Sequence, residues 1–284
     1  MNEHLKAAMK HEPNYFTSLN ATRLFYNFWR NESSQTCLII VHGFGEHSGR
    51  YQELVNALLD LKLNICTFDL RGHGRSEGKE VFVNQFCDFK NDLLGLRRLI
   101  QSTYSINQFI LFGHSMGGLI ALDAMLAEPL AWQRLMLSSP FLGIPFGEPL
   151  LRELSRILNL IVPGMVWDNP VPPIGLTHDK SELEVYSRDA LIRRRITIRL
   201  AHEMFQACRS IRVRANEITK PLFVMSAGQD RVVSLKRTQE LVQQVRTSDK
   251  EFHVFDGFYH EILHEVERKK VIQLFKSYLI RSGL

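Results

Sequence analysis

Continuous apolar runs that stop at polar turns alternate with segments of helical periodicity along the first half of the chain. A strand buried on both faces of a parallel sheet reads as such a run, whereas an amphipathic helix repeats its apolar residues about every three to four positions. The runs predict strands, and the periodic segments between them predict helices. The predicted strands are 14–19, 23–29, 37–41, 63–68, 108–112 and 134–139, and the predicted helices are 50–62, 86–100 and 115–127.

The alternation stops after residue 140 and resumes near residue 220. The segment between holds most of the prolines and no clear buried strand. Strands are predicted again at 221–226 and 251–255, and helices at 234–246 and 267–281. Such alternation is typical of an α/β fold, a mainly parallel central sheet with helices on both faces. We therefore predict an α/β core of residues 1–140 and 220–284, with residues 141–219 inserted between two sheet strands as a helical cap.

One segment of the predicted cap has a one-sided pattern, with apolar residues at helical spacing and polar residues on the other face. The apolar residues are Leu150, Leu154, Ile157, Leu158 and Ile161. Such a helix either packs its apolar face on the sheet edge or lines an acyl-chain tunnel that touches lipid at its mouth. The basic run at 193–195 is either a solvated face or a contact for anionic lipid.

Composition and charge narrow the function classes. The 284 residues can bury a sizeable core. The 35 Lys and Arg against 30 Asp and Glu give a formal charge of +5 that is not gathered into one arm, so no nucleic-acid partner is predicted. The cysteines form no C-x-x-C pair, the first residues lack the apolar segment of a secretory signal, and no apolar run approaches the ~18 residues of a membrane span. These features predict a cytoplasmic protein with reduced thiols.

Residues Gly113-His114-Ser115-Met116-Gly117 match the G-x-S-x-G pattern of a serine nucleophile. The letters alone are weak evidence, because a chain of this length contains them by accident roughly one time in ten. Their context is stronger, since a predicted strand precedes them and a predicted helix follows, as the turn beneath such a serine requires. A simple helix N-cap would explain Ser115 but neither glycine. We predict that Ser115 is a nucleophile.

A serine nucleophile needs a base, and the base needs an orienting acid. In this architecture they follow the order serine, acid, histidine, each after the C-terminal end of a strand. Asp230 and His260 each follow one of the last two predicted strands. His253 is placed within a strand, and His264 within or at the start of the last helix, so both fit less well. The predicted catalytic triad is Ser115, Asp230 and His260.

The oxyanion formed when serine attacks an ester needs two N–H donors. Met116 is the predicted first donor because it directly follows the nucleophile, and the second is expected in the loop after the first buried strand. That loop reads His42-Gly43-Phe44-Gly45, which makes the N–H of Phe44 the predicted second donor. The histidines expected only to shape loops near this edge are His42, His73 and His114.

The letters His260-Glu261-Ile262-Leu263-His264 also match H-E-x-x-H, the pattern of a zinc site on a helix. That site would place both histidines on one helix face, use Glu261 as a base and need a third ligand. Gly257 disfavours a helix already formed at His260, and the triad gives His260 another role. We therefore predict no metal and no organic cofactor.

Six stretches together resemble the α/β-hydrolase superfamily, and within it the monoacylglycerol lipases and lysophospholipases. They are 42–51, 69–78, 113–118, 137–140, 227–233 and 259–265. The resemblance implies the same triad and the same oxyanion donors. It also implies that Glu46 and Arg50 help to organise a pocket for the polar head group, although a structural ion pair explains the same residues. Phe44 stands where the animal monoacylglycerol lipases carry a small residue, which leaves the head group open.

The combined prediction is a serine hydrolase that cleaves carboxylic esters of single-chain lipids, monoacylglycerol or lysophospholipid, through an acyl-enzyme. Alternatives on the same triad are a general carboxylesterase, a thioesterase or an acyltransferase. A non-catalytic binding protein with this fold is a further alternative, but it would be expected to lack a triad member. The predicted partner is a lipid ester substrate, with peripheral membrane contact through the cap left open and the oligomeric state undetermined.

Overall fold

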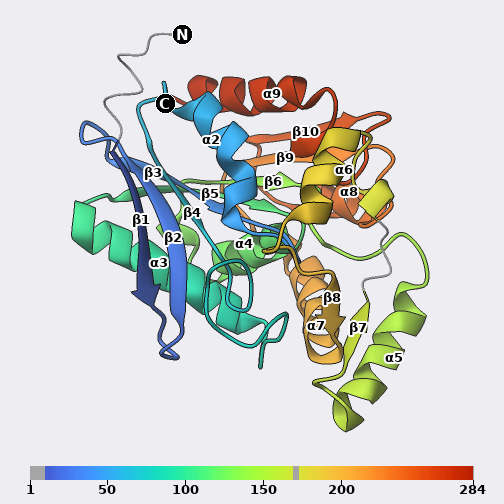
Figure 1. Cartoon of the computed structure of the whole chain (residues 1–284). Coiled ribbons are helices and arrows are strands. Elements are labelled where there is room, and N and C mark those ends of the chain that lie inside the picture. The colour runs from blue at the N-terminus through green and yellow to red at the C-terminus, as the bar shows by residue number, and fades with distance from the viewer. Residues whose placement is uncertain (1–9, 169–172, 284) are drawn as a thin grey trace.

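A computed structural model describes residues 10–168 and 173–283 (Figure 1). Its central sheet has the strand order β1-β2-β4-β3-β5-β6-β9-β10. β1 pairs with β2 and β2 with β4 in antiparallel fashion, whereas the other neighbours are parallel. The predicted mainly parallel sheet is confirmed. Its strands are β1 (Lys10–Thr17), β2 (Arg23–Arg30), β3 (Thr36–Val41), β4 (Asn64–Phe68), β5 (Gln108–His114), β6 (Arg134–Ser138), β9 (Leu222–Ala227) and β10 (Lys250–Phe255).

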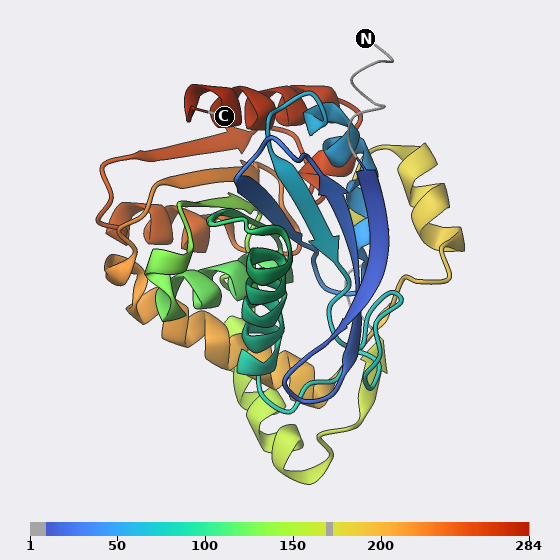
Figure 2. The ribbon, with the colours of Figure 1, turned by 90° about the vertical axis from the view of Figure 1, so that its left-hand side faces the viewer.

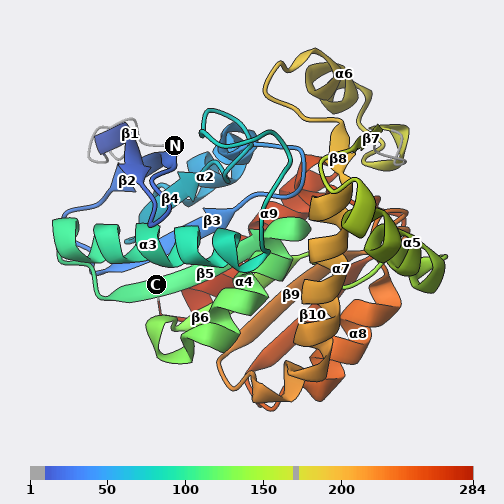
Figure 3. The same ribbon diagram turned by 90° about the horizontal axis from the view of Figure 1, so that it is seen from below.

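Helices cover both faces of this sheet (Figure 3). One face carries α3 (Cys87–Tyr104), α4 (Met116–Ala127), α7 (Ile198–Val213) and α8 (Leu235–Gln244), and the other carries α2 (Gln52–Leu58) and α9 (Arg268–Arg281). The side chains of each central strand alternate between two hydrophobic cores, one on each face of the sheet. In β5, Phe109 and Leu111 pack in the core beneath α3 and α4, and Ile110 and Phe112 pack in the core beneath α2 and α9. Because both faces are buried, the strand reads as one continuous apolar run.

The hairpin at the sheet edge departs most from the prediction. β1 covers Lys10–Thr17 instead of 14–19, and Leu19 lies exposed in the turn that follows. The strand contains Pro13, which an edge strand tolerates because one side of it has no pairing partner. Most of its described side chains face solvent, so it has no apolar run that would reveal where it begins.

Between β6 and β9 the chain leaves the sheet. It forms α5 (Glu148–Ile161), β7 (Val166–Asp168), α6 (Lys180–Arg188), β8 (Arg195–Thr197) and then α7, with β7 and β8 paired as a small antiparallel ribbon. β6 and β9 are adjacent parallel strands, so this segment is an insertion between neighbours. Figure 2 shows α5 projecting from one end of the molecule and α6 standing apart from the sheet. By contrast, α7 packs its apolar face in the core.

The amphipathic helix α5 turns its apolar face outward. Its buried residues are Glu148 and Ser155, and Arg212 of α7 binds Glu148 with Nη2 2.9 Å from Oε1. The interpretation that this face packs on the sheet edge is therefore wrong. The exposed apolar side chains of α5 and its approach are Phe146, Leu150, Leu151, Leu154, Ile157, Leu160 and Ile161.

The remaining global features concern thiols and membranes. All four cysteines are free, and Cys37, Cys66 and Cys208 are buried. Across the described ranges, no helix combines the length and the apolar character that a bilayer crossing needs.

Candidate active site

Ser115 occupies a sharp turn between β5 and α4. Its backbone has φ 52° and ψ −120°, which is strained for any residue other than glycine. The surrounding backbone holds this turn: Ser115 N–H donates to the carbonyl of Ser138 at 3.0 Å, and Ser115 C=O accepts the N–H groups of Gly118 and Phe141. A conformation maintained against strain in this way is a mark of a functional residue.

Close backbone contacts explain the two glycines that flank Ser115. A Cβ on Gly113 would lie 2.3 Å from the carbonyl oxygen of Gly117, and a Cβ on Gly117 would lie 2.2 Å from that of Val41. Either side chain would push the turn away from its neighbours. The Ser115 side chain makes no capping hydrogen bond to the helix, so the N-cap alternative is wrong.

The three residues of the predicted triad lie together in the structure. Ser115 Oγ is 2.9 Å from His260 Nε2, and His260 Nδ1 is 2.8 Å from Asp230 Oδ2. The other oxygen of Asp230 accepts the N–H groups of Val232 and Val233. When the Nδ1 proton is donated to Asp230, Nε2 is left to accept the proton of the serine hydroxyl. The arrangement can therefore activate Ser115.

Electrostatics make His260 a stronger base than usual. Burial lowers its pKa, but Asp230, through its charge and hydrogen bond, together with the charges of Glu261 and Glu46, outweighs burial and raises the pKa. Burial raises the pKa of Asp230, and its contacts with His260 and two backbone N–H groups outweigh this and keep the carboxylate ionised. The His114 ring lies 4.9 Å from that of His260, and burial lowers the pKa of His114 to about 4, so it stays neutral.

The loop after β3 lies against Ser115. A Cβ on Gly43 would be only 3.2 Å from Ser115 Cβ. The N–H of Gly43 donates to Glu46 Oε1, whereas the N–H groups of Phe44 and Met116 donate to no other residue in the part of the chain that the structure describes. An oxyanion donor must be unoccupied in this way. The oxyanion roles of Phe44 and Met116 stay predictions.

The other histidines of this region make structural contacts. His42 fixes its loop, since Leu70 N–H donates to Nε2 at 2.9 Å and Nδ1 lies 2.7 Å from the Gly43 carbonyl. His114 Nδ1 lies 3.1 Å from the carbonyl of Ser138. His253 sits within β10, with Nε2 3.0 Å from Oε2 of a glutamate on the same strand. None of these contacts competes with His260 for the role of base.

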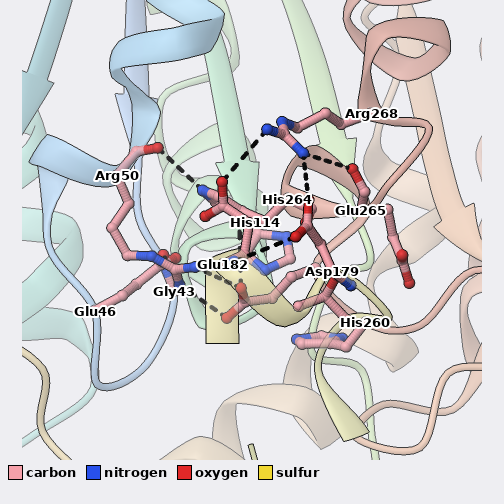
Figure 4. Close-up of polar contacts among 12 residues, drawn as sticks. Gly43, Glu46, Arg50, His114, Asp179, Glu182, His260, His264, Glu265 and Arg268 are labelled. Carbon is pink, nitrogen blue, oxygen red and sulfur yellow. Dashed lines mark hydrogen bonds and ion pairs between the residues drawn. The ribbon is translucent and has the colours of Figure 1, made fainter. Parts of the chain in front are cut away.

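Glu46 and Arg50 lie in a buried ionic network near His260 (Figure 4). Arg50 Nη1 donates to Glu46 Oε2 at 3.2 Å, and the guanidinium makes two hydrogen bonds to Glu261, of 2.8 and 2.6 Å. Tyr51 donates its hydroxyl to Glu46 Oε1 at 2.7 Å. The ion pair that the sequence left open is present, and a contact with a substrate head group stays a prediction.

Two acidic residues near His260 were not predicted from the sequence. Glu261 binds Arg50, and the buried Glu265 accepts the N–H of Tyr259 and lies 2.9 Å from His178 Nδ1. Their partners are distant in sequence, and the only local signal, H-E-x-x-H, pointed to a zinc site. Both residues hold the loop that carries His260.

The stretch 257–264 does not form the helix that an H-E-x-x-H zinc site needs. His260 lies in a loop, and His264 ends a short 3-10 turn (Ile262–His264) that precedes α9. The placement of His264 within or at the start of the last helix is wrong. His264 Nε2 lies 3.0 Å from the backbone carbonyl of Arg50. Within residues 10–168 and 173–283, no three His, Cys, Asp or Glu side chains are grouped to hold a metal ion.

A serine on a strained strand–helix turn, with an aspartate and a histidine after later strands of a mainly parallel sheet, defines an α/β-hydrolase. Solved structures agree with this fold. A monoacylglycerol lipase from Paleococcus ferrophilus aligns with a TM-score of 0.82 over 96% of this chain and 99% of that chain, at 24% identity.

The chain belongs to the family described as "Serine aminopeptidase, S33", which matches residues 32–267. Human monoglyceride lipase is 31% identical over 246 residues, or 85% of this chain and 80% of the human protein. Monoacylglycerol lipase of Mycolicibacterium smegmatis is 26% identical over 268 residues, or 93% and 95% of the two chains. The prediction of a serine ester hydrolase that resembles monoacylglycerol lipases is confirmed.

Proposed function

We propose that the protein hydrolyses monoacylglycerols through an acyl-enzyme on Ser115. His260 Nε2 takes the hydroxyl proton as Ser115 Oγ bonds to the ester carbonyl carbon, and the N–H groups of Phe44 and Met116 stabilise the oxyanion. The tetrahedral intermediate collapses, the ester C–O bond breaks, and His260 returns its proton to the departing glycerol oxygen. Water, deprotonated by His260, then bonds to the acyl carbon, the bond from that carbon to Ser115 Oγ breaks, and His260 returns the proton to Oγ as the fatty acid leaves. Asp230 orients the imidazole throughout.

The observation that carries this proposal is the unbroken hydrogen-bonded line from Ser115 through His260 to Asp230. Both links are shorter than 3 Å, being 2.9 and 2.8 Å. Ser115 is buried, and the side chains of His260 and Asp230 are only 5% and 2% exposed, which strengthens their interaction. A binding protein that had lost catalysis would have no need to maintain the strained backbone of Ser115.

The charge beside the site favours an uncharged head group. Arg50 offsets only one of the two negative charges of Glu46 and Glu261. Burial raises the pKa of each carboxyl group, but Arg50, together with neighbouring histidines, outweighs burial and lowers both pKa values. Both carboxyl groups therefore stay ionised. His264 adds no positive charge, because burial and Arg50 lower its pKa. The network therefore carries one net negative charge. This field does not act on an uncharged glycerol head group, whereas it repels the phosphate of a lysophospholipid, most strongly when no choline cation balances that phosphate.

The outward apolar face of α5 supports a lipid-contacting role for the cap, residues 141–219. A contiguous exposed apolar surface of this kind is typical of proteins that rest on a membrane or bind a partner. We assign it to peripheral contact with the lipid surface that supplies the substrate. In the run at 193–195, Arg193 pairs with Glu80 and Arg195 pairs with Asp168, whereas Arg194 donates to the Ser187 carbonyl and keeps its positive charge.

A panel of substrates tests the proposed function. The value of kcat/KM is measured for monoacylglycerols, lysophosphatidylcholines and p-nitrophenyl esters, each with short to long acyl chains. Monoacylglycerols with long chains should be the best substrates, and Ser115→Ala should turn over none of them. Ser226→Ala is the matched control, because Ser226 is a buried serine on β9 whose hydroxyl has no partner within the described residues. Faster turnover of lysophospholipids, or activity confined to short esters, would overturn the substrate assignment.

A further inference from the structure

Two loops supply the proposed chemistry to Ser115 from different parts of the sheet. The loop that carries Phe44 follows β3, and the loop that carries His260 follows β10. In the strand order, β5, β6 and β9 separate these two strands, so no shared ladder of hydrogen bonds sets the position of one loop relative to the other. Nucleophilic attack nevertheless needs the oxyanion donors and the base in register on the same serine.

Arg50 is the side chain that connects the two loops. Its guanidinium makes the two hydrogen bonds to Glu261, of 2.8 and 2.6 Å, and the third, of 3.2 Å, to Glu46. Its own backbone carbonyl lies 3.0 Å from His264 Nε2. Figure 4 shows the Arg50 side chain beside Glu46 and Gly43, and the backbone carbonyl of Arg50 facing His264. One residue therefore holds the His260 loop by both its side chain and its main chain.

The two carboxylates that Arg50 binds are each attached to the proposed machinery. Glu46 accepts the N–H of Gly43, the residue before Phe44, and so fixes the backbone just ahead of the oxyanion donor. Glu261 directly follows His260 in the chain. A movement of the guanidinium is thus transmitted through Glu46 and Gly43 to Phe44, and through Glu261 to His260.

We propose that Arg50 is a positioning residue that ties the oxyanion loop to the general-base loop and sets the distance between them. This inference rests on the proposed roles of Phe44 and His260. It differs from the head-group role that the family resemblance implies for Arg50.

The surroundings of Arg50 favour positioning over substrate binding. The side chains of Arg50, Glu46 and Glu261 are only 8%, 5% and 8% exposed. Tyr186 of α6 lies over the guanidinium, with its ring centre 5.1 Å from Cζ. A planar guanidinium can bind two carboxylates at fixed angles, which the single ammonium group of lysine cannot reproduce. Arg50→Lys therefore keeps the charge and removes the geometry.

The test compares Arg50→Lys with the wild-type protein on two esters. One is a monoacylglycerol, and the other is p-nitrophenyl butyrate, which has no glycerol. Loss of positioning should lower kcat by about 10- to 100-fold for both esters and change KM little, because misplacement of about 1 Å has an effect of this size. The rate at which a fluorophosphonate labels Ser115 should fall in parallel.

Arg71→Lys is the matched control. Arg71 forms an equally buried two-point pair with Asp92, at 2.6 and 2.6 Å, and contacts neither the triad nor the oxyanion loop. It should lower the melting temperature to a similar extent and leave kcat unchanged. If Arg50→Lys does not fold, Glu261→Gln replaces it, since this variant keeps the side-chain shape and leaves Arg50 paired with Glu46.

Each outcome separates the alternatives. A fall in kcat for both esters, without a matching fall in the control, supports the proposal. A rise in KM for the monoacylglycerol alone identifies Arg50 as a head-group contact and overturns it, and so does unchanged kinetics on both esters. If the wild-type protein itself hydrolyses neither ester and does not react with the fluorophosphonate, the proposed function fails instead.

Discussion

Replacing Leu150 and Leu160 with glutamine should weaken binding of the protein to lipid vesicles. Both side chains lie on the outward apolar face of α5, with 74% and 75% of their surface exposed. Neither packs in the apolar cores, so the double variant should fold as the wild type does. The change therefore removes apolar surface that the proposed lipid contact would bury.

The structure sets the size of the effect. Full burial of an exposed leucine side chain stabilises by about 1.5–3 kcal/mol, so three quarters of each side chain corresponds to about 1–2 kcal/mol and the pair to about 2–4 kcal/mol. A factor of ten corresponds to about 1.4 kcal/mol, so the vesicle partition coefficient should fall by about 30- to 1000-fold.

Co-sedimentation with phosphatidylcholine vesicles measures this partition coefficient. The matched control is the Leu19→Gln/Leu130→Gln variant, because these leucines are 80% and 92% exposed but lie outside the cap. The control should bind as the wild type does, and all three proteins should hydrolyse soluble p-nitrophenyl butyrate at equal rates. Equal vesicle binding by the α5 variant and the wild type, or equal losses in both variants, would refute the assignment of α5 as the lipid contact.

Three further predictions concern the triad and the buried histidines. Asp230→Asn should lower kcat by about 10⁴-fold with little change in KM, because His260 loses the partner that selects its tautomer. Steady-state kinetics measures both constants, and only a small fall in kcat would contradict this role of Asp230. Since the pKa of His260 is raised and the reaction needs its neutral form, kcat/KM should fall as the pH drops through a value above the ordinary ~6.5, and an acid limb below that value would be evidence against His260 as base. Burial lowers the pKa of His73 to about 3 and that of His114 to about 4, so the unfolded chain binds more protons below pH ~6.5. The free energy of unfolding in urea should therefore decrease from pH ~6.5 to pH ~4, by up to about 1.4 kcal/mol per pH unit for each histidine, and an increase would contradict the neutral assignment.

The core strands were predictable because each carries its own signal. Residues 37–41 and 109–112 are apolar at successive positions, and both faces of the strand are buried along these stretches. β1 was misplaced by several residues because an edge strand with polar side chains has no such run. The outward orientation of α5 was also beyond the sequence, since periodicity locates an apolar face but does not say which neighbour it meets.

The proximity of Ser115, Asp230 and His260 was predictable from the G-x-S-x-G motif and from chain order, because Asp230 and His260 follow the strands that the architecture requires. The network around Arg50 was not. Glu261 lies 211 residues from Arg50 along the chain, and no spacing rule connects two such positions. The sequence around Glu261 indicates only a zinc motif, because the motif itself does not show whether the chain forms a loop or a helix at His260.

Reaction with a fluorophosphonate, followed by intact-protein mass measurement and peptide mapping, tests the central claim most directly. The account predicts a single adduct on Ser115 of the wild-type protein, together with complete loss of ester turnover. Ser115→Ala should acquire no adduct and no activity while keeping the wild-type melting temperature, and Ser226→Ala should react as the wild type does. An adduct on another residue, or ester turnover that persists in Ser115→Ala, would contradict the assignment of Ser115 as the nucleophile.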